Sequence, residues 1–264
     1  MPKPKNNAQL PDGQHPKLRG FNICMGVLHF AQATAMYFLS NDFTLPVTSA
    51  FVEFDRTSQT LVPMVESVFE FRLGPIVALF LLLSAIAHWT ISLPGVYQWY
   101  LRNLGRGANY ARWIEYSFSS SVMIVVVAML TGMYDGISLM LMFFLNAMMI
   151  LFGWMMELHN QSTKQTNWTA YWFGIIAGAV PWVAIALYLL NAGSGEAKAP
   201  SFVYWIFFSI FVFFNIFAVN MVLQYKKIGK WRDYLYGEKA YIVLSLVAKS
   251  LLAWQVWAGT LRPV

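Results

Sequence analysis

Charge and cysteine are both scarce in this chain of 264 residues. Only 11% of its residues are charged, whereas a soluble domain usually carries about 25%. This shortage argues against a globule that faces water on all sides. The single cysteine excludes an internal disulfide framework and a metal cage built from cysteine ligands.

Apolar and aromatic residues take the place of charge. They include 21 Phe, 13 Tyr, 11 Trp and 14 Met, and apolar residues make up 58% of the chain. Such a composition is typical of a helix bundle packed in lipid and suits one that encloses a large apolar ligand. The net charge of +6 raises nucleic acid as a partner, but the basic residues form no single basic face. We therefore expect a membrane protein with lipid around it and no nucleic-acid partner.

Seven segments are long and apolar enough to cross a bilayer, which takes about 20 residues. They are residues 19–41, 73–93, 108–133, 136–158, 168–191, 200–224 and 239–261. The first 18 residues lack the apolar core and cleavage site of a signal peptide, so the first span should be retained. Most links are short, which makes consecutive helices antiparallel neighbours. The sequence thus predicts an all-α membrane protein, with one seven-transmembrane-helix domain over residues 1–264.

Residues 42–72 form the one long connection. Its two halves, 43–54 and 60–71, are rich in Phe, Val and Thr, and they flank the polar stretch Asp55-Arg56-Thr57-Ser58. This pattern predicts a β-hairpin outside the membrane, as the first extracellular loop. An irregular cap over the bundle is the alternative.

The orientation of the chain follows from its lysines and arginines. Thirteen of them lie on the side of the N-terminus, namely Lys3, Lys5, Lys17, Arg19, Arg102, Arg106, Arg112, Lys164, Lys226, Lys227, Lys230, Arg232 and Lys239. Four lie on the other side, namely Arg56, Arg72, Lys198 and Arg262. Because cytoplasmic loops carry the excess of basic residues, we expect a cytoplasmic N-terminus and an extracellular C-terminus in the cell membrane.

Lys249 is the exception among the basic residues, because it lies in the middle of the last span, AYIVLSLVAKSLLAWQVWAGTL. A charge at that depth costs on the order of 2.5–3.5 kcal/mol even on the most lenient scale, so it marks a functional site by default. A buried lysine amine can attack an aldehyde and form a Schiff base. A plain ion pair that joins two helices is the alternative.

Glu115 is the expected partner, as the only carboxylate that we place well inside a span. A rise of 1.5 Å per residue puts Glu115 about 10 Å and Lys249 about 15 Å from the cytoplasmic ends of their helices. A protonated Schiff base in a low-dielectric interior needs such a counterion. Arg112 could pair with Glu115 or extend to the membrane surface, and both interpretations stay open at this point.

Two serines share faces with this pair. Ser245 lies four residues before Lys249, and Ser119 lies four residues after Glu115, so each projects beside its partner. Either hydroxyl could instead bond to its own helix backbone.

Two histidines are expected at the depth of Glu115. His29 and His88 are candidates for a proton relay, because imidazole titrates near neutrality, and hydrogen-bonded core histidines are the alternative. Asn146, at mid-depth in the fourth span, could line a ligand pocket or bond to a neighbouring helix. No metal site is expected, because no pair of ligands with i,i+4 spacing supports one.

The chain resembles the heliorhodopsins over residues 19 to 262. The resemblance rests on the cytoplasmic N-terminus, the long first outer loop and the stretches RWIEYSFSSSVMIVVVA, ILFGWMMELH, YWFGIIAGAVPW and QYKKIGKWRDYLYGEKAYIVLSLVAKSLLAWQVWAGTL. The stretch in the last span is highly specific. Ordinary proton-pumping rhodopsins place an acid where this chain has Ser245.

The resemblance implies a retinal-binding photoreceptor that is not an enzyme. Lys249 would carry all-trans retinal as a protonated Schiff base, with Glu115 as its counterion. The remaining positions implied by the family are the hydroxyls Ser245 and Ser119, the histidines His29 and His88 of a cytoplasmic-half proton network, and the pocket residues Met123, Asn146 and Phe214. The family further implies a slow photocycle, generally without ion transport, a homodimer, and an unidentified signalling partner.

Two other functions stay open from the sequence. A light-driven or light-gated proton conductor would give a current on illumination. A transporter or scaffold without pigment, in which Lys249 and Glu115 form a plain ion pair, would show no visible absorption after retinal is added.

Overall fold

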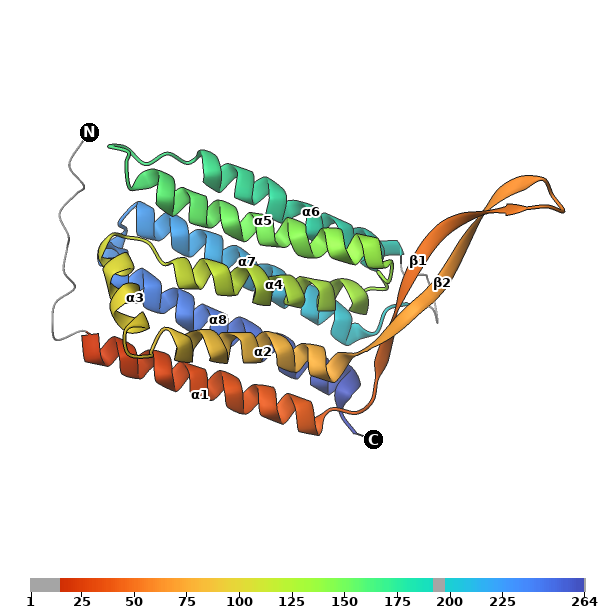
Figure 1. The fold of residues 1–264 in the computed structure, drawn as a ribbon, viewed down its shortest axis with the longest axis horizontal. Coiled ribbons are helices and arrows are strands. Elements are labelled where there is room, and N and C mark those ends of the chain that lie inside the picture. The colour runs from red at the N-terminus through yellow and green to blue at the C-terminus, as the bar shows by residue number, and fades with distance from the viewer. Residues whose placement is uncertain (1–14, 192–197, 264) are drawn as a thin grey trace.

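The computed structural model describes residues 15–191 and 198–263. Within them, seven long helices lie side by side, the short helix α3 crosses one end of the bundle, and a two-stranded hairpin extends from the other end (Figure 1). The predicted seven-helix bundle with a hairpin is therefore confirmed. The N-terminal tail to residue 14, with Lys3 and Lys5, and residues 192–197 of the link before the sixth span lie outside the described residues.

The long helices follow the apolar segments of the sequence. They are α1 (His15–Leu39), α2 (Leu73–Thr90), α4 (Tyr110–Leu130), α5 (Gly136–Asn160), α6 (Thr169–Asn191), α7 (Ser201–Tyr225) and α8 (Tyr234–Val256), and α8 continues as a π-helical turn over Trp257–Leu261. All but α1 are both long and apolar enough to span a membrane. Polar side chains such as Asn22 and His29 interrupt α1, which nevertheless packs along α2 (Figure 1).

Two short elements were not expected from the sequence. Helix α3 (Val96–Gly105) and the 3-10 turn Gly229–Arg232 both lie in connections. Helix α8 also begins earlier than the expected residue 239, because the carboxylate of Asp233 caps it and accepts a hydrogen bond from the Leu235 amide at 3.0 Å.

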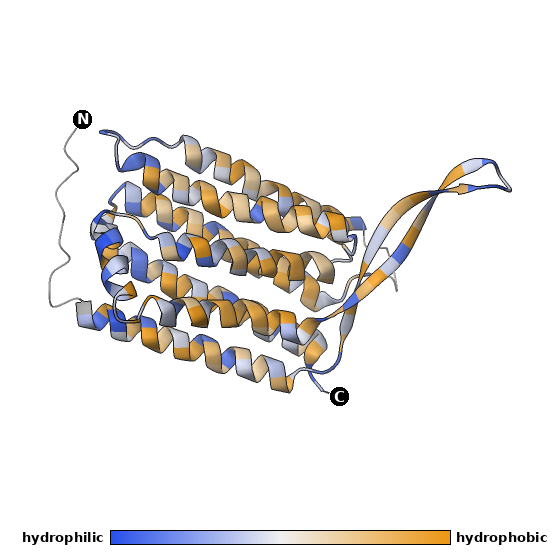
Figure 2. Cartoon of the chain, viewed as in Figure 1, coloured by the Kyte–Doolittle hydropathy of each residue, from blue (hydrophilic) through white to orange (hydrophobic). Residues whose placement is uncertain are grey.

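Apolar residues occupy the middle of the long helices, whereas polar ones gather at the α3 end and at the tip of the hairpin (Figure 2). The main core contains buried residues of α2, α4, α6, α7 and α8, among them Leu81, Val127, Ile185, Ile210 and Leu252. An apolar belt bounded by polar ends is the pattern of a membrane protein.

The hairpin is formed by β1 (Thr44–Asp55) and β2 (Thr60–Arg72), which pair in antiparallel fashion from Thr44–Arg72 to Asp55–Thr60. The alternative of an irregular cap is therefore wrong. At the base of the hairpin, the Thr48 amide donates to the Tyr134 carbonyl at 2.8 Å. The next residue, Asp135, caps α5 by accepting from the Ser138 amide at 2.7 Å. Bonds from the Ser138 hydroxyl and backbone N–H lower the pKa of Asp135, and this anion stabilises the N-terminus of α5. The backbone contact of Thr48 with Tyr134 and Asp135 joins the hairpin to the α4–α5 turn.

Candidate functional site

Lys249 of α8 lies in the interior of the bundle and is only 3% exposed. Its Nζ donates to Glu115 Oε1 of α4 at 3.0 Å and to Ser245 Oγ, one turn earlier on α8, at 2.8 Å. The ring of Tyr116 adds a further contact, with its centroid 5.0 Å from Nζ. The structure thus brings together the lysine, the acid and the serine that the sequence singled out.

Glu115 is held from a third helix as well. Ser84 of α2 donates its hydroxyl to Glu115 Oε1 at 2.7 Å, so one carboxylate oxygen joins α2, α4 and α8. Sequence reasoning missed Ser84, although it lies one turn before His88 and so shares the face of that helix. Ser119 is fully buried, but its hydroxyl has no hydrogen-bond partner among the described residues.

The two histidines stack on each other next to this pair. Their ring centroids are 5.7 Å apart and the rings are 17° from parallel. His88 Nδ1 forms a 2.9 Å hydrogen bond with Asn22 Oδ1, whereas neither ring nitrogen of the buried His29 has a partner in the described part of the chain. A cavity of about 390 Å³ lies beside them, and both His88 and Glu115 line it.

A second cavity, of about 400 Å³, borders the other side of Lys249. Its lining residues are mostly apolar or aromatic: Tyr116, Ser120, Met123, Met149, Ile150, Phe214, Phe217, Ser245 and Ala248. It adjoins a wider hollow of about 980 Å³ between α5, α6 and α7, with which it shares Tyr116, Met149, Ile150, Phe214 and Phe217. The predicted pocket residues Met123 and Phe214 thus lie in its wall.

Asn146 does not line this cavity. Its Nδ2 donates to Ser120 Oγ at 2.8 Å and to Ser121 Oγ at 3.1 Å. Of the two expectations for Asn146, the structure shows the hydrogen bond between helices, which joins α5 to α4 beside the cavity.

The residues of this cavity fit an elongated apolar aldehyde such as retinal. Sites for small molecules combine apolar walls with a few placed polar groups. Here an amine lies in the wall at Lys249, with its anion 3.0 Å away. The ring of Trp182 packs edge-on against Phe214 at 5.4 Å and stiffens the far wall.

The sequence profile of the heliorhodopsin family matches residues 18–261. The chain belongs to the heliorhodopsin family. Members of this family bind retinal as their chromophore, and the family is not a classical enzyme family.

A solved structure supports the same fold. The crystal structure of a light-driven proton pump from Leptosphaeria maculans matches with a TM-score of 0.62 and 14% identity, over 95% of this chain and 97% of that chain. At this identity the likeness shows the fold alone. No curated protein sequence matches the chain.

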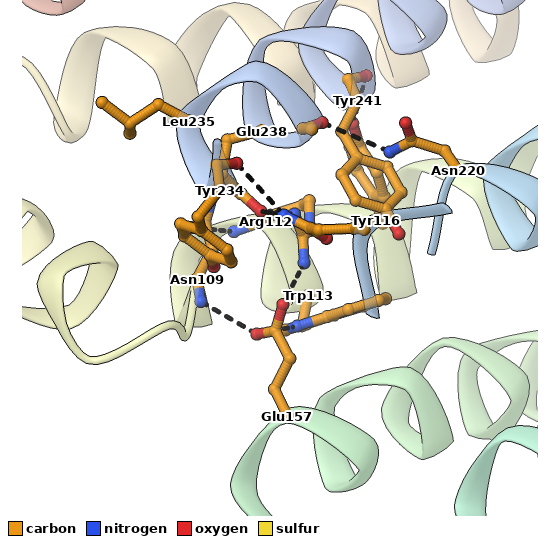
Figure 3. A network of polar contacts seen from close by, with 12 residues as sticks. Asn109, Arg112, Trp113, Tyr116, Glu157, Asn220, Tyr234, Leu235, Glu238 and Tyr241 are labelled. Atoms are coloured by element: carbon orange, nitrogen blue, oxygen red, sulfur yellow. Dashed lines mark hydrogen bonds and ion pairs between the residues drawn. The ribbon is translucent and has the colours of Figure 1, made fainter. Parts of the chain in front are cut away.

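This heliorhodopsin contains a second buried ionic site, around Arg112 of α4 (Figure 3). Arg112 does not pair with Glu115 and does not extend to the surface, so both expectations for it were wrong. Its guanidinium forms ion pairs with Glu157 of α5 and Glu238 of α8. The three side chains are 4%, 2% and 1% exposed. We call Arg112, Glu157 and Glu238 the ionic cluster.

Neutral donors complete the ionic cluster. Glu157 Oε2 accepts from Trp113 Nε1 at 2.6 Å and from the backbone N–H of Asn109 at 2.9 Å. Glu238 accepts from Asn109 Nδ2 at 2.7 Å and from Gln224 Nε2 at 3.1 Å. Because α4, α5, α7 and α8 all contribute, the cluster fastens four helices at the α3 end of the bundle.

Sequence reasoning missed both acids of the cluster, and Glu115 is therefore not the only buried carboxylate. Glu157 falls at the end of an expected span and Glu238 one residue before another, which is where solvated acids usually lie. Both acids are nevertheless buried, because residues at the start of α4 and Gln224 of α7 pack against them. No signal in the linear sequence links the two acids to Arg112, because 45 and 126 residues separate them from it.

We predict that Arg112→Gln destabilises the protein more than Glu157→Gln does. Removing the only cation leaves two buried carboxylates unpaired, which should cost about 3–5 kcal/mol of unfolding free energy. Removing one acid leaves a balanced pair of Arg112 with Glu238. Thermal unfolding in detergent measures both effects, with the exposed Arg102→Gln as control. Equal losses in the two cluster variants would contradict this account of the charge balance.

Proposed function

We propose that this heliorhodopsin is a light sensor with a slow photocycle, in which Lys249 carries all-trans retinal and Glu115 is the counterion. The observation that carries the proposal is the buried Lys249–Glu115 pair, 3.0 Å long, in the wall of an apolar cavity. Bound to Lys249 as a protonated Schiff base, retinal supplies visible absorption and a light-driven isomerisation.

Glu115 and Ser245 would hold the proton at Nζ in the dark. Both accept hydrogen bonds from this atom at 3.0 Å or less, and Ser84 fixes the accepting oxygen of Glu115. In this buried site the cation needs its anion, because an isolated buried charge costs several kcal/mol. Any displacement of Nζ away from Glu115 therefore makes the proton on Nζ easier to lose. Loss of this proton would change the charge at Nζ inside a packed bundle and so act as a switch.

Ser245 supports a sensor over a pump. It lies one turn before Lys249 and accepts a hydrogen bond from Nζ, at the position where ordinary proton-pumping rhodopsins carry an acid. A serine hydroxyl is no source of protons at neutral pH. The proton should then return along the route by which it left, which gives a slow cycle without net transport.

The partners that we propose are lipid, a second copy of the chain and an unidentified signalling protein. The hairpin supports an interface beyond the single chain, because large apolar side chains stay exposed on it, among them Val52, Leu61, Val65 and Val68. Light scattering in detergent should give the mass of a homodimer. The mass of a monomer would exclude one under those conditions.

We also propose a cytoplasmic N-terminus and an extracellular C-terminus, on the count of basic residues. Trypsin added to intact cells should then cut at Arg56 in the hairpin and spare the loop that holds Lys226, Lys227 and Lys230. Permeabilised cells, cut at both places, are the control. Cleavage of the Lys226 loop in intact cells would reverse the orientation.

Lys249→Ala should abolish the visible pigment after retinal is added, because the other lysines in the described part of the chain lie at helix ends or in connections. Lys239→Ala removes an exposed lysine from the same helix and should leave the absorption spectrum unchanged. A visible band in Lys249→Ala that resists hydroxylamine would place the attachment elsewhere.

Glu115→Gln should shift the absorption of the protonated pigment to longer wavelength. The substitution replaces a carboxylate with a neutral amide, and that carboxylate stabilises the positive charge near Nζ in the ground state. Ser84→Ala keeps the anion and removes only its hydrogen bond, so its shift should be smaller. An unchanged spectrum in Glu115→Gln would assign the counterion to another residue.

Illumination of cells that express the unmodified protein with retinal should give a slow spectral cycle and no sustained current. Absorption changes and photocurrent are recorded from the same cells, with the Leptosphaeria proton pump as the positive control. A steady photocurrent that follows the proton gradient would reject the sensor and favour the light-driven or light-gated proton conductor.

A further inference from the structure

We propose that the ionic cluster of Arg112, Glu157 and Glu238 is the proton acceptor of the photocycle. In this assignment a carboxylate of the cluster takes up the proton that leaves Lys249 Nζ and returns it in the dark. The inference rests on the proposed function, since it needs a proton to leave that atom, and it names a binding site for that proton.

The charge balance of the cluster favours proton uptake. One guanidinium faces two carboxylates, so with both acids ionised the cluster carries one surplus negative charge. All three side chains are almost fully buried, and an uncompensated charge in such a place is costly. A bound proton makes the cluster neutral.

The hydrogen bonds indicate where that proton can be held. All four carboxylate oxygens accept from N–H donors, which is the arrangement expected of two ionised acids in the dark. Arg112 Nε is buried and has no hydrogen-bond partner within the described ranges. The Tyr241 ring lies against Arg112, 4.0 Å from the guanidinium carbon (Figure 3). The cluster therefore has one unused N–H donor when a new O–H forms.

A polar cavity joins the cluster to the counterion. Glu115 and His88 line the 390 Å³ cavity together with Arg112 and Asn109. Asn109 in turn donates to both acids of the cluster. Arg112 lies three residues before Glu115 on α4, about 4.5 Å along the helix axis. The polar groups in its wall offer hydrogen bonds to water, which would relay a proton over the remaining gap.

Several titratable or charged groups surround the two acids. From the elements packed around the cluster they are Tyr100 of α3, Arg112 and Tyr116 of α4, Tyr225 of α7, and Tyr234 and Tyr241 of α8. Arg112 is the only cation in this set. The surplus of negative charge is therefore not cancelled by another described group at the cluster.

His29 is the main competing acceptor, because both its ring nitrogens lack a partner in the described residues. Protonation of His29 would create a new buried cation stacked on another imidazole, with no anion bonded to it. Protonation of the cluster instead neutralises the surplus negative charge of its two carboxylates. The geometry therefore favours the cluster.

The step is a proton transfer and needs no other reactant. The N–H bond at Nζ breaks, its electron pair stays on nitrogen, and an O–H bond forms on Glu157 or Glu238. The reverse transfer restores the dark state. While the proton is on the cluster, Arg112 keeps an ionic partner on only one of the helices α5 and α8, so the event changes how these helices are fastened at the α3 end of the bundle.

Infrared difference spectroscopy of the retinal-loaded protein tests the assignment. Illumination should raise a C=O band of a protonated carboxyl group as the protonated pigment is lost, and that band should shift in Glu157→Asp or Glu238→Asp. The exposed Glu53→Gln is the matched control and should leave it unchanged. The absence of such a band, or a band that neither cluster variant moves, would overturn the proposal and assign the proton to a histidine or to Glu115.

A second measurement needs no light and no retinal. Acidification of the retinal-free protein should produce a buried carboxyl band that slow deuterium exchange separates from the exposed acids, and Glu157→Asp or Glu238→Asp should shift this band too. If neither variant alters it, the cluster does not bind a proton and the proposal fails. A sustained photocurrent, together with a carboxyl band that the cluster variants shift, would reject the proposed sensor function and leave the proton acceptor assigned to the cluster. Failure of the proposed function can therefore be told apart from failure of this inference.

Discussion

The structure depends on the requirement that every charge inside an apolar bundle must find a partner. Lys249 meets it with Glu115 at 3.0 Å, and Ser84 and Ser245 complete the contact. Because these groups come from α2, α4 and α8, the pair fixes the relative positions of three helices. The same pair leaves an amine beside an apolar cavity, so one interaction both stabilises the interior and forms the site where we propose that retinal binds.

Helix α4 contributes to two ionic sites that differ in net charge. The Lys249–Glu115 pair is neutral as a whole, whereas the ionic cluster, one turn away, has two acids for one base. A shared polar cavity lies between them. In the transfer that we propose, a proton would move over this short distance from Lys249 to the cluster and would link the lysine to the end of the bundle where α3 and the turn before α8 lie.

The fold alone does not decide what the protein does. A solved proton pump shares the arrangement of helices at 14% identity, and a likeness at this level shows the fold alone. Function therefore has to be argued from single side chains near Nζ. Ser245, which accepts a hydrogen bond from Nζ, is the residue on which our proposal of a cycle without net transport rests.

The sequence by itself determined the number of long helices, the hairpin, and the Lys249–Glu115 pair, because apolar length and a charge at mid-membrane depth are local properties of the chain. Helical spacing likewise placed Ser245 beside Lys249. Only the tertiary structure decided the partners of Arg112, since Glu157 and Glu238 lie at helix ends where the sequence suggests solvent. Both acids are buried because α4, α5, α7 and α8 bring their polar side chains together at that end of the bundle. A contact between helices far apart in the chain has no local signature, and the charge balance of the cluster follows from such contacts.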